Sequence, residues 1–204
     1  MKTKILFHLP TILKSYSLKV IFVSLTVLLS HSLTVRAQSL QFYREDIVFK
    51  MSENQVTTDA QYHFCNIGGK EIKTTLFYPF PGKTMEQIDT LVIWNIKTNE
   101  MIPYREGKSG VFFGINVDAY GQAAYRIFFQ QWIKDKTFKY ILTSTQTWGK
   151  SLEFANFELQ VPANLVVDSL SYPPDSTDFL GEIKHYYWKK KDFLPGNDFE
   201  VVFH

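Results

Sequence analysis

The stretch from residue 56 to 65 alternates strictly between two kinds of side chain. Val56, Thr58, Ala60, Tyr62 and Phe64 fall on one phase, and mostly polar residues fill the other. Successive side chains of an extended strand point to opposite faces, so a period of two places these five on one face. No window of the sequence sustains apolar residues at helical spacing. The pattern predicts a strand with one face in a hydrophobic core.

Similar runs, rich in Val, Ile, Phe, Tyr and Thr and broken by Gly, Pro, Asn and Asp, recur along the chain. Short strands at regular spacing are typical of an all-β fold. We expect residues 38–204 to form a single domain, a two-sheet antiparallel β-sandwich of about ten strands, with a closed barrel as the alternative. The expected strands are residues 40–49, 56–65, 71–78, 88–96, 111–117, 122–132, 137–145, 154–161, 183–191 and 198–203.

Two hairpins are predicted between neighbouring strands. The segment Asn66-Ile67-Gly68-Gly69 offers a tight turn between residues 56–65 and 71–78, since Gly readily adopts a positive φ. A second turn near residues 134–136 should join residues 122–132 to residues 137–145.

The first 37 residues have the order of a secretory signal peptide. Four lysines precede an apolar run at residues 20–29, and Val35-Arg36-Ala37 provides a cleavage site. As a helix, that run spans only ~15 Å, half of a ~30 Å hydrocarbon core, so cleavage is favoured over a retained anchor. We expect cleavage near Ala37, no permanent membrane span afterwards, and a secreted or periplasmic protein.

The net charge of the remaining chain argues against nucleic acid as a partner. Five of the 22 basic residues and none of the 20 acidic ones lie in the first 37 residues, so residues 38–204 carry a net charge of −3. A polyanion-binding domain needs a clustered excess of Lys and Arg.

Several stretches resemble known β-sandwich domains. Residues 56–64 followed by Asn66, the Tyr-Pro-Phe-Pro segment at 78–81, and residues 124–130 resemble the amino-terminal β-sandwich domain of inter-alpha-trypsin inhibitor heavy chains and vault proteins. Residues 138–145, Trp148, residues 155–162 and residues 192–195 are similar to uncharacterised secreted bacterial β-sandwich proteins. The resemblance covers roughly residues 40–204. It implies a sandwich with no assigned activity and transfers no catalytic residue.

Motifs for catalysis are missing from the sequence. Gly107-Lys108-Ser109 and Gly149-Lys150-Ser151 lack the earlier glycine of a phosphate-binding loop, because Ile102 and Ser144 occupy its place. No Gly-x-Ser-x-Gly or His-Glu-x-x-His arrangement occurs. We therefore predict neither an enzyme nor a bound cofactor.

Two groups of residues could in principle hold a metal ion. His63 and Cys65 project from one face of a predicted strand, but two ligands do not complete a zinc site. Asp175, Asp178 and Glu182 gather carboxylates in a loop, at a spacing that matches no calcium-binding motif. For both groups we favour solvated or structural side chains, and we predict no metal site.

The most suggestive surface combines aromatic rings with a basic run at residues 185–191. Such a combination can stack on sugars or contact a partner. We favour the structural interpretation, in which Ile183, His185 and Tyr187 lie on one face of a strand, Tyr186 and Trp188 lie on the other, and the lysines protect an edge strand from aggregation. The candidate ligand or partner surface consists of Trp148, Tyr186, Trp188, Lys189, Lys190 and Lys191.

Together these features predict an exported, non-catalytic binding or scaffolding module of the cell envelope. We expect a monomer whose partner is an envelope protein in preference to a glycan. One alternative is an eight-stranded outer-membrane β-barrel. The other is an enzyme with an unrecognised site in residues 168–182, where Asp175 and Asp178 lie.

Overall fold

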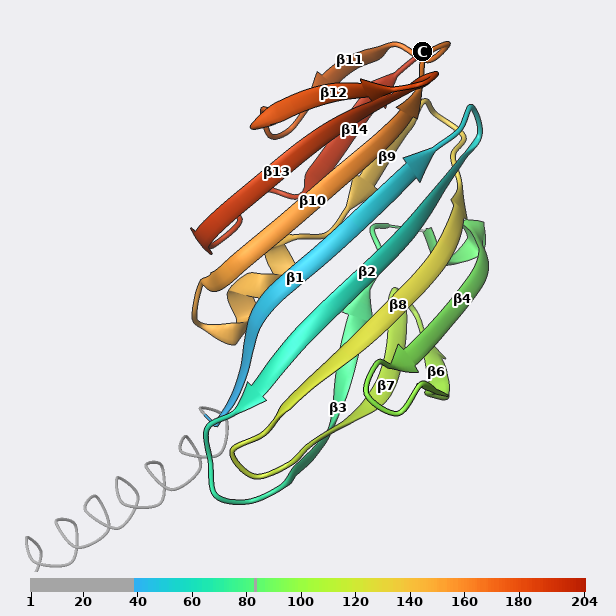
Figure 1. Ribbon diagram of the computed structural model, residues 1–204. Helices are drawn as coiled ribbons and strands as arrows, with labels where there is room; N and C mark the ends of the chain where they lie inside the picture. Colours follow the sequence, from blue (N-terminus) through green and yellow to red (C-terminus); the bar gives the residue numbers. More distant parts are fainter. Residues whose placement is uncertain (1–38, 83) are drawn as a thin grey trace, which may run out of the picture. The chain divides into compact units, whose positions relative to one another are not determined.

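Strands make up most of the computed structural model, which describes residues 39–82 and 84–204 (Figure 1). Residues 40–204 form one compact unit, and the predicted signal peptide lies outside the described residues. In this part of the chain, two 3-10 helices accompany the strands, η1 (Thr84–Gln87) and η2 (Thr143–Trp148). The predicted all-β class is confirmed. None of the described residues belongs to a helix long and apolar enough to cross a membrane.

One layer of the fold is an eight-stranded sheet (Figure 1). At its centre, β1 (Leu40–Met51) pairs antiparallel with β2 (Gln55–Asn66) and parallel with β10 (Leu152–Pro162), so the sheet is mixed. From edge to edge its strands are β12 (Ser176–Leu180), β13 (Ile183–Phe193), β10, β1, β2, β8 (Gln122–Trp132), β4 (Ile88–Asn95) and β5 (Glu100–Met101).

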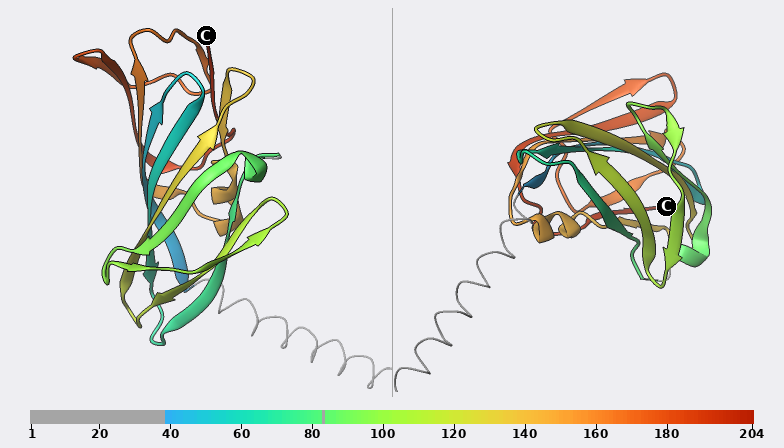
Figure 2. Two further views of the ribbon diagram at one scale, coloured as in Figure 1. Left: turned by 90° about the vertical axis from the view of Figure 1, so that its right-hand side faces the viewer. Right: turned by 90° about the horizontal axis from the view of Figure 1, so that it is seen from below.

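The second layer consists of two three-stranded antiparallel sheets. Both lie on the same face of the large sheet, as the edge view of Figure 2 shows. The sandwich is thus confirmed, with one layer divided in two and with more strands than the expected ten. The smaller sheets are β3 (Ile72–Pro79), β7 (Gly110–Val117) and β6 (Tyr104–Gly107), and β11 (Val167–Leu170), β14 (Phe199–Phe203) and β9 (Thr137–Tyr140).

The large sheet has two free ends. Its outermost strands, β12 and β5, do not pair with each other. The alternative of eight strands closed on themselves therefore does not describe the observed topology.

The pairing of both predicted hairpins is wrong. β2 cannot pair with β3, because β1 and β8 occupy its two edges. β8 pairs with β2 and β4, and β9 consequently joins β14 in the second layer. After β2, the side chain of Asn66 organises the turn by donating to the carbonyls of Lys70 (2.7 Å) and Asp118 (2.9 Å) and accepting from the N–H of Gly68 (2.9 Å). This turn carries the chain from one layer to the other.

The core between the layers is built largely from aromatic rings. Phe49 of β1 stacks on Phe199 of β14 with ring centroids 5.0 Å apart. Phe129 of β8 meets Phe80, which follows β3, edge to face at 5.0 Å. All four rings are buried. The two small sheets thus each cover part of one continuous core, and the junction between them falls over β1 and β2.

Candidate functional site

Three tyrosine hydroxyls meet where the three sheets come together. Tyr62 lies on β2, Tyr78 on β3 and Tyr140 on β9. The hydroxyl of Tyr78 is 2.9 Å from that of Tyr62 and 3.1 Å from that of Tyr140, and the hydroxyls of Tyr62 and Tyr140 are also hydrogen-bonded to each other. All three side chains are buried. This hydroxyl triangle (Tyr62, Tyr78, Tyr140) links both small sheets to the large one.

Glu45 is a buried acid beside the hydroxyl triangle. It lies on β1, directly opposite Tyr62 in the β1–β2 register, and is only 2% exposed. Its Oε1 atom is buried and has no hydrogen-bond partner. Burying a polar atom without a partner costs free energy, so such an atom usually has a compensating role. Glu45 is therefore the strongest sign of a functional site in the fold.

A β-bulge explains why an acid faces the core at this point. The β1–β2 register shifts between Phe42 and Arg44, so that Tyr43 is an extra residue on β1. Phe42 and Glu45 are consequently both buried, although they are three positions apart. Bulges often re-aim side chains next to functional sites.

Burial controls the protonation of these groups. Loss of solvent raises the pKa of Glu45 from 4.5 to about 8, and the nearby negative charge of Asp46 adds to the effect. Burial also raises the pKa of Tyr62, Tyr78 and Tyr140 above their usual value of 10.0, with a contribution from Glu45. At neutral pH the free protein therefore holds a protonated Glu45 and three neutral tyrosines.

A cavity of about 310 Å³, the junction pocket, opens beside these groups. Phe42, Phe64 and Trp148 form one wall, with ring centroids 5.3 to 5.7 Å apart, and Phe77, 44% exposed, lies at the mouth. Ligand sites typically have ~300–1,000 Å³ and combine apolar walls with a few polar groups. The lining residues are Phe42, Glu45, Tyr62, Phe64, Thr75, Leu76, Phe77, Tyr78, Pro79, Phe113, Ile127, Tyr140, Ile141, Ser144, Thr145, Thr147 and Trp148.

A second cavity, of about 560 Å³, is larger, but the carboxylate of Asp198 in its lining already has hydrogen-bond and ion-pair partners. Its lining includes Asp198, whose Oδ1 accepts hydrogen bonds from the N–H (3.1 Å) and Oγ1 (2.7 Å) of Thr143 at the start of η2. Lys139 lies 3.5 Å from the other carboxylate oxygen. Among the described residues that line this cavity, none has a buried side-chain nitrogen or oxygen atom without a hydrogen-bond partner. We therefore regard the junction pocket as the better candidate, although it is smaller.

The predicted aromatic and basic surface is not formed as expected. Tyr186 and Trp188 of β13 are buried in the core, 8% and 1% exposed, so the prediction that they lie on a surface is wrong. Trp148 contacts Phe42 and Phe64 at the junction pocket instead. Of the six predicted residues, the structure thus places one in the pocket and two in the core.

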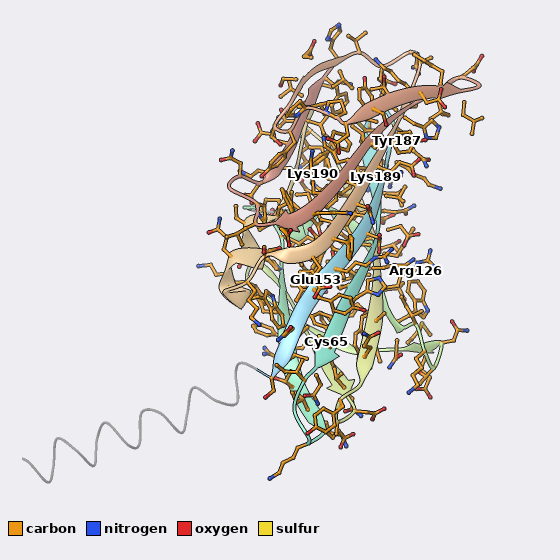
Figure 3. The ribbon with its side chains drawn as sticks, turned by 60° about the vertical axis from the view of Figure 1, so that its left-hand side comes forward. Cys65, Arg126, Glu153, Tyr187, Lys189 and Lys190 are labelled. Atoms are coloured by element: carbon orange, nitrogen blue, oxygen red, sulfur yellow. The ribbon has the colours of Figure 1, made fainter. Side chains whose placement is uncertain are left out.

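The three lysines of that prediction remain together on β13, and Figure 3 shows Lys189 and Lys190 next to Tyr187 and well apart from Cys65. β12 pairs with residues 183–187 only, so residues 189–191 extend beyond the end of β12. The Nζ of Lys190 lies 2.6 Å from Asp175 Oδ1. This arrangement agrees with the structural alternative, in which lysines protect an uncovered strand edge.

The residues considered as metal ligands have other contacts. His63 Nε2 lies 3.2 Å from Asp46 Oδ2, and the Cys65 thiol lies 3.9 Å from Gln41 Oε1. Within residues 39–82 and 84–204, no group of three or more His, Cys, Asp or Glu side chains could hold a metal ion.

The acids between residues 168 and 182 are likewise dispersed. Asp175 contacts β13, whereas Asp178 Oδ1 accepts a hydrogen bond from the N–H of the adjacent Phe179 at 2.7 Å. Asp168 pairs with the ring of His204 at 2.9 Å. Since each carboxylate has a different partner, they do not form one site.

Sequence reasoning missed Glu45 and the junction pocket. A signal was present: counting back in steps of two from Phe49 and Ile47 places Glu45 on the inward phase, together with Tyr43 and not Phe42. The adjacent aromatic residues Tyr43 and Phe42 cannot both face inward in a regular strand. An acid at an inward-facing position next to such a pair indicates a bulge and a buried polar site. The tyrosines around Glu45 could not be found this way, because they come from β2, β3 and β9.

Comparison with known proteins gives similarity in fold. No protein-family model matches the sequence, and no curated protein matches it significantly. The structure is similar to that of a "putative nutrient binding protein" from Legionella pneumophila, with a TM-score of 0.63 and 10% identity, covering 81% of this chain and 67% of that one. It is also similar to an M1 zinc metallopeptidase from Deinococcus radiodurans, with a TM-score of 0.50 and 9% identity, covering 80% of this chain and 42% of that one.

This chain therefore spans less than half the length of the metallopeptidase. At 9–10% identity these similarities establish a shared β architecture and transfer no residue roles.

Proposed function

We propose that residues 40–204 form a non-catalytic binding module and that the junction pocket is its ligand site. The observation that carries this proposal is Glu45, whose Oε1 is buried without a hydrogen-bond partner in the lining of a cavity of about 310 Å³. A ligand that supplies a polar partner for Glu45 would remove the free-energy cost of that unpartnered atom.

The composition of the lining also supports a binding role. Eight of the lining residues are aromatic, and the polar side-chain groups besides Glu45 are hydroxyls and the indole N–H of Trp148. Apolar walls with a few oriented polar groups are typical of small-ligand sites. The name of the Legionella pneumophila protein is compatible with this role, and the predicted signal peptide would deliver the module outside the cytoplasm.

A small ligand accounts for the structure better than the envelope protein or glycan predicted from sequence. Tyr186 and Trp188, which were to provide the partner surface, are buried. The resemblance to the amino-terminal domain of inter-alpha-trypsin inhibitor heavy chains stays a prediction.

Blocking the mouth of the pocket tests the proposal. Thr75 is exposed and lines the pocket, whereas its neighbour Thr74 is exposed and outside the lining. The unfolding temperature of the purified protein would be measured against a library of small metabolites, since a ligand that binds the native state raises it. A compound that stabilises the native protein should lose its effect on Thr75→Trp and keep it on Thr74→Trp. Equal stabilisation of the two variants would place binding elsewhere.

A further inference from the structure

The free polar atoms of the hydroxyl triangle are hydrogen-bond acceptors. The hydroxyl triangle contains three O–H donors and three hydroxyl contacts, and Tyr78 donates to Tyr140. If each hydroxyl donates once around the triangle, every donor is used inside it. Each phenolic oxygen then keeps capacity only to accept. A ligand group seated beside the triangle should therefore bring its own donors.

When Glu45 is ionised, the electrostatic character of the pocket favours positive charge. Glu45 becomes an acceptor-only carboxylate when it ionises. Among the described residues that line the pocket, none is Lys, Arg or His. An ionised Glu45 thus has no cationic partner within the pocket, and a ligand must supply one.

The aromatic walls of the pocket also favour a cationic ligand. Phe42, Phe64 and Trp148 gather at one side, and Tyr62 contacts Phe42 with ring centroids 5.9 Å apart. The negative faces of aromatic rings attract cations, and aromatic cages recognise quaternary ammonium groups. Desolvating a cation is costly unless a counter-charge accompanies the rings, and Glu45 provides that charge.

From this geometry we infer that the junction pocket binds a compact organic ammonium group, with Glu45 as its counter-ion and Phe42, Phe64 and Trp148 as its aromatic wall. The inference rests on the proposed function, because it names the ligand class of the same pocket. The hydroxyl triangle accepts hydrogen bonds from any N–H or O–H group that the ligand carries near the charge.

Binding of such a group should be linked to proton release. The pKa of Glu45 is about 8 in the free protein. The titratable groups that face it from packed elements are Tyr62 on β2, Tyr78 on β3 and Tyr140 on β9, all with pKa values raised above 10.0, and Asp46 neighbours it on β1. Glu45 is therefore the group that ionises below pH 9. Below pH 8 a cation must displace its proton, so affinity should fall by up to about tenfold per pH unit.

Calorimetric titration of the purified protein with choline tests the inference. The comparison ligand is 3,3-dimethylbutan-1-ol, which has the same shape with carbon in place of the charged nitrogen. At about pH 8.5 choline should bind more tightly than the neutral alcohol. Glu45→Gln should weaken choline binding roughly 30-fold or more, the effect of removing one partner of a buried charge pair. Glu53→Gln, the same substitution at an exposed acid that does not line the pocket, is the matched control and should keep the affinity.

The pH dependence provides a second readout. As the pH falls from about 8.5 to about 6.5, choline should lose affinity, and its binding should release a number of protons that rises from about a quarter to close to one. The release is detected as a heat that varies with the buffer. Glu45→Gln should show neither effect.

The outcomes separate the two proposals. Equal binding of choline and the alcohol, unaffected by Glu45→Gln but lost in Thr75→Trp, would overturn the ammonium inference and keep the pocket as a binding site. If choline fails to bind at millimolar concentration, the inference is also wrong. If, in addition, no library compound distinguishes Thr75→Trp from Thr74→Trp, the proposed function fails with it.

Discussion

Glu45 and Tyr62 are direct cross-strand partners in the antiparallel β1–β2 pair, and both side chains are buried at the junction of the three sheets. Cross-strand partners have Cβ atoms ~4.5–5.5 Å apart, so the register alone brings the acid to the hydroxyl triangle. Because the β1–β2 ladder fixes this relationship, the polar centre of the pocket is part of the framework of the fold.

The first prediction concerns the pH dependence of stability. The pKa of Glu45 is raised from 4.5 to about 8 on folding. Folding therefore favours the protonated carboxyl. The stability that depends on this protonation is fully present below pH 4.5 and is lost as the pH rises through 8. Between these values the loss approaches about 1.4 kcal/mol per pH unit. Glu45→Gln cannot ionise and should therefore lack this pH-dependent loss of stability.

Urea unfolding of the native protein and of Glu45→Gln at several pH values provides the measurement. The variant should match the native protein near pH 4.5 and be more stable near pH 8. Other groups also titrate in this range, so the difference between the two proteins carries the result. A constant difference at all pH values would mean that folding leaves the pKa of Glu45 at its ordinary value.

The second prediction concerns the hydroxyl triangle. Tyr62→Phe removes the hydroxyl that contacts both Tyr78 and Tyr140, so each of these hydroxyls loses one hydrogen-bond partner. The free energy of unfolding should fall by about 1–3 kcal/mol, the usual cost of leaving buried polar groups unsatisfied. Tyr104→Phe, at a residue that is 37% exposed, is the control and should have little effect.

A double-mutant cycle distinguishes the triangle from independent contacts. Tyr62 and Tyr140 share a hydrogen bond, so the loss of stability in the double variant Tyr62→Phe/Tyr140→Phe should be smaller than the sum of the two single losses. Strict additivity would show that the two hydroxyls do not interact.

The sequence was sufficient for the fold class and for the inward faces of individual strands. The alternation of residues 56–64 correctly places Val56, Tyr62 and Phe64 in the core, because a period of two depends only on local geometry. Strand pairing could not be obtained in this way. β2 has turn residues after it, but its two edges are occupied by β1, which precedes it in the chain, and by the distant strand β8, so β3 must pair elsewhere.

The end of β9 illustrates a second limit. Residues 137–145 were expected to form one strand, whereas the strand ends at Tyr140 and η2 begins at Thr143. Asp198, 55 residues further along the chain, accepts two hydrogen bonds from Thr143 and fixes this turn. A distant side chain thus overrides the strand preference of the Thr-rich segment, and it also brings Trp148 to the junction pocket.

The third prediction tests the core position of Trp188. Its indole N–H donates to the carbonyl of Tyr172 at 3.2 Å, and its ring meets Phe199 edge to face at 5.1 Å. Trp188→Ala should lower the free energy of unfolding by about 3–5 kcal/mol, as large-to-small changes in cores do. Trp132→Ala, at a residue that is 49% exposed, should cost far less. Chemical denaturation of both variants checks this. Equally small losses of unfolding free energy in the two variants would indicate that Trp188 lies at the surface.

The fourth prediction addresses Asp175, which belongs to the segment considered for an unrecognised enzyme site. Its Oδ2 accepts a hydrogen bond from the N–H of Lys189 at 2.7 Å, and its Oδ1 lies 2.6 Å from Lys190 Nζ. The hydrogen bond with Lys190 lowers the pKa of Asp175, so its stabilising effect is present above pH 3.8 and is lost as the pH falls through the lowered pKa. Because the pair is largely exposed, Asp175→Ala should cost only about 0.2–1 kcal/mol, and less at high salt.

Asp175→Asn separates the two contacts of this residue. Asn keeps an oxygen for the N–H of Lys189 but loses the charge that pairs with Lys190, so it should recover part of the stability lost in Asp175→Ala. Asp178→Asn is the matched control, since the Asp178 carboxylate contacts only the N–H of the adjacent Phe179 among the hydrogen bonds of the described residues. Denaturation at low and high salt gives the stability. If either Asn variant instead retained full stability and abolished an activity of the native protein, these acids would be functional, and the module would be an enzyme.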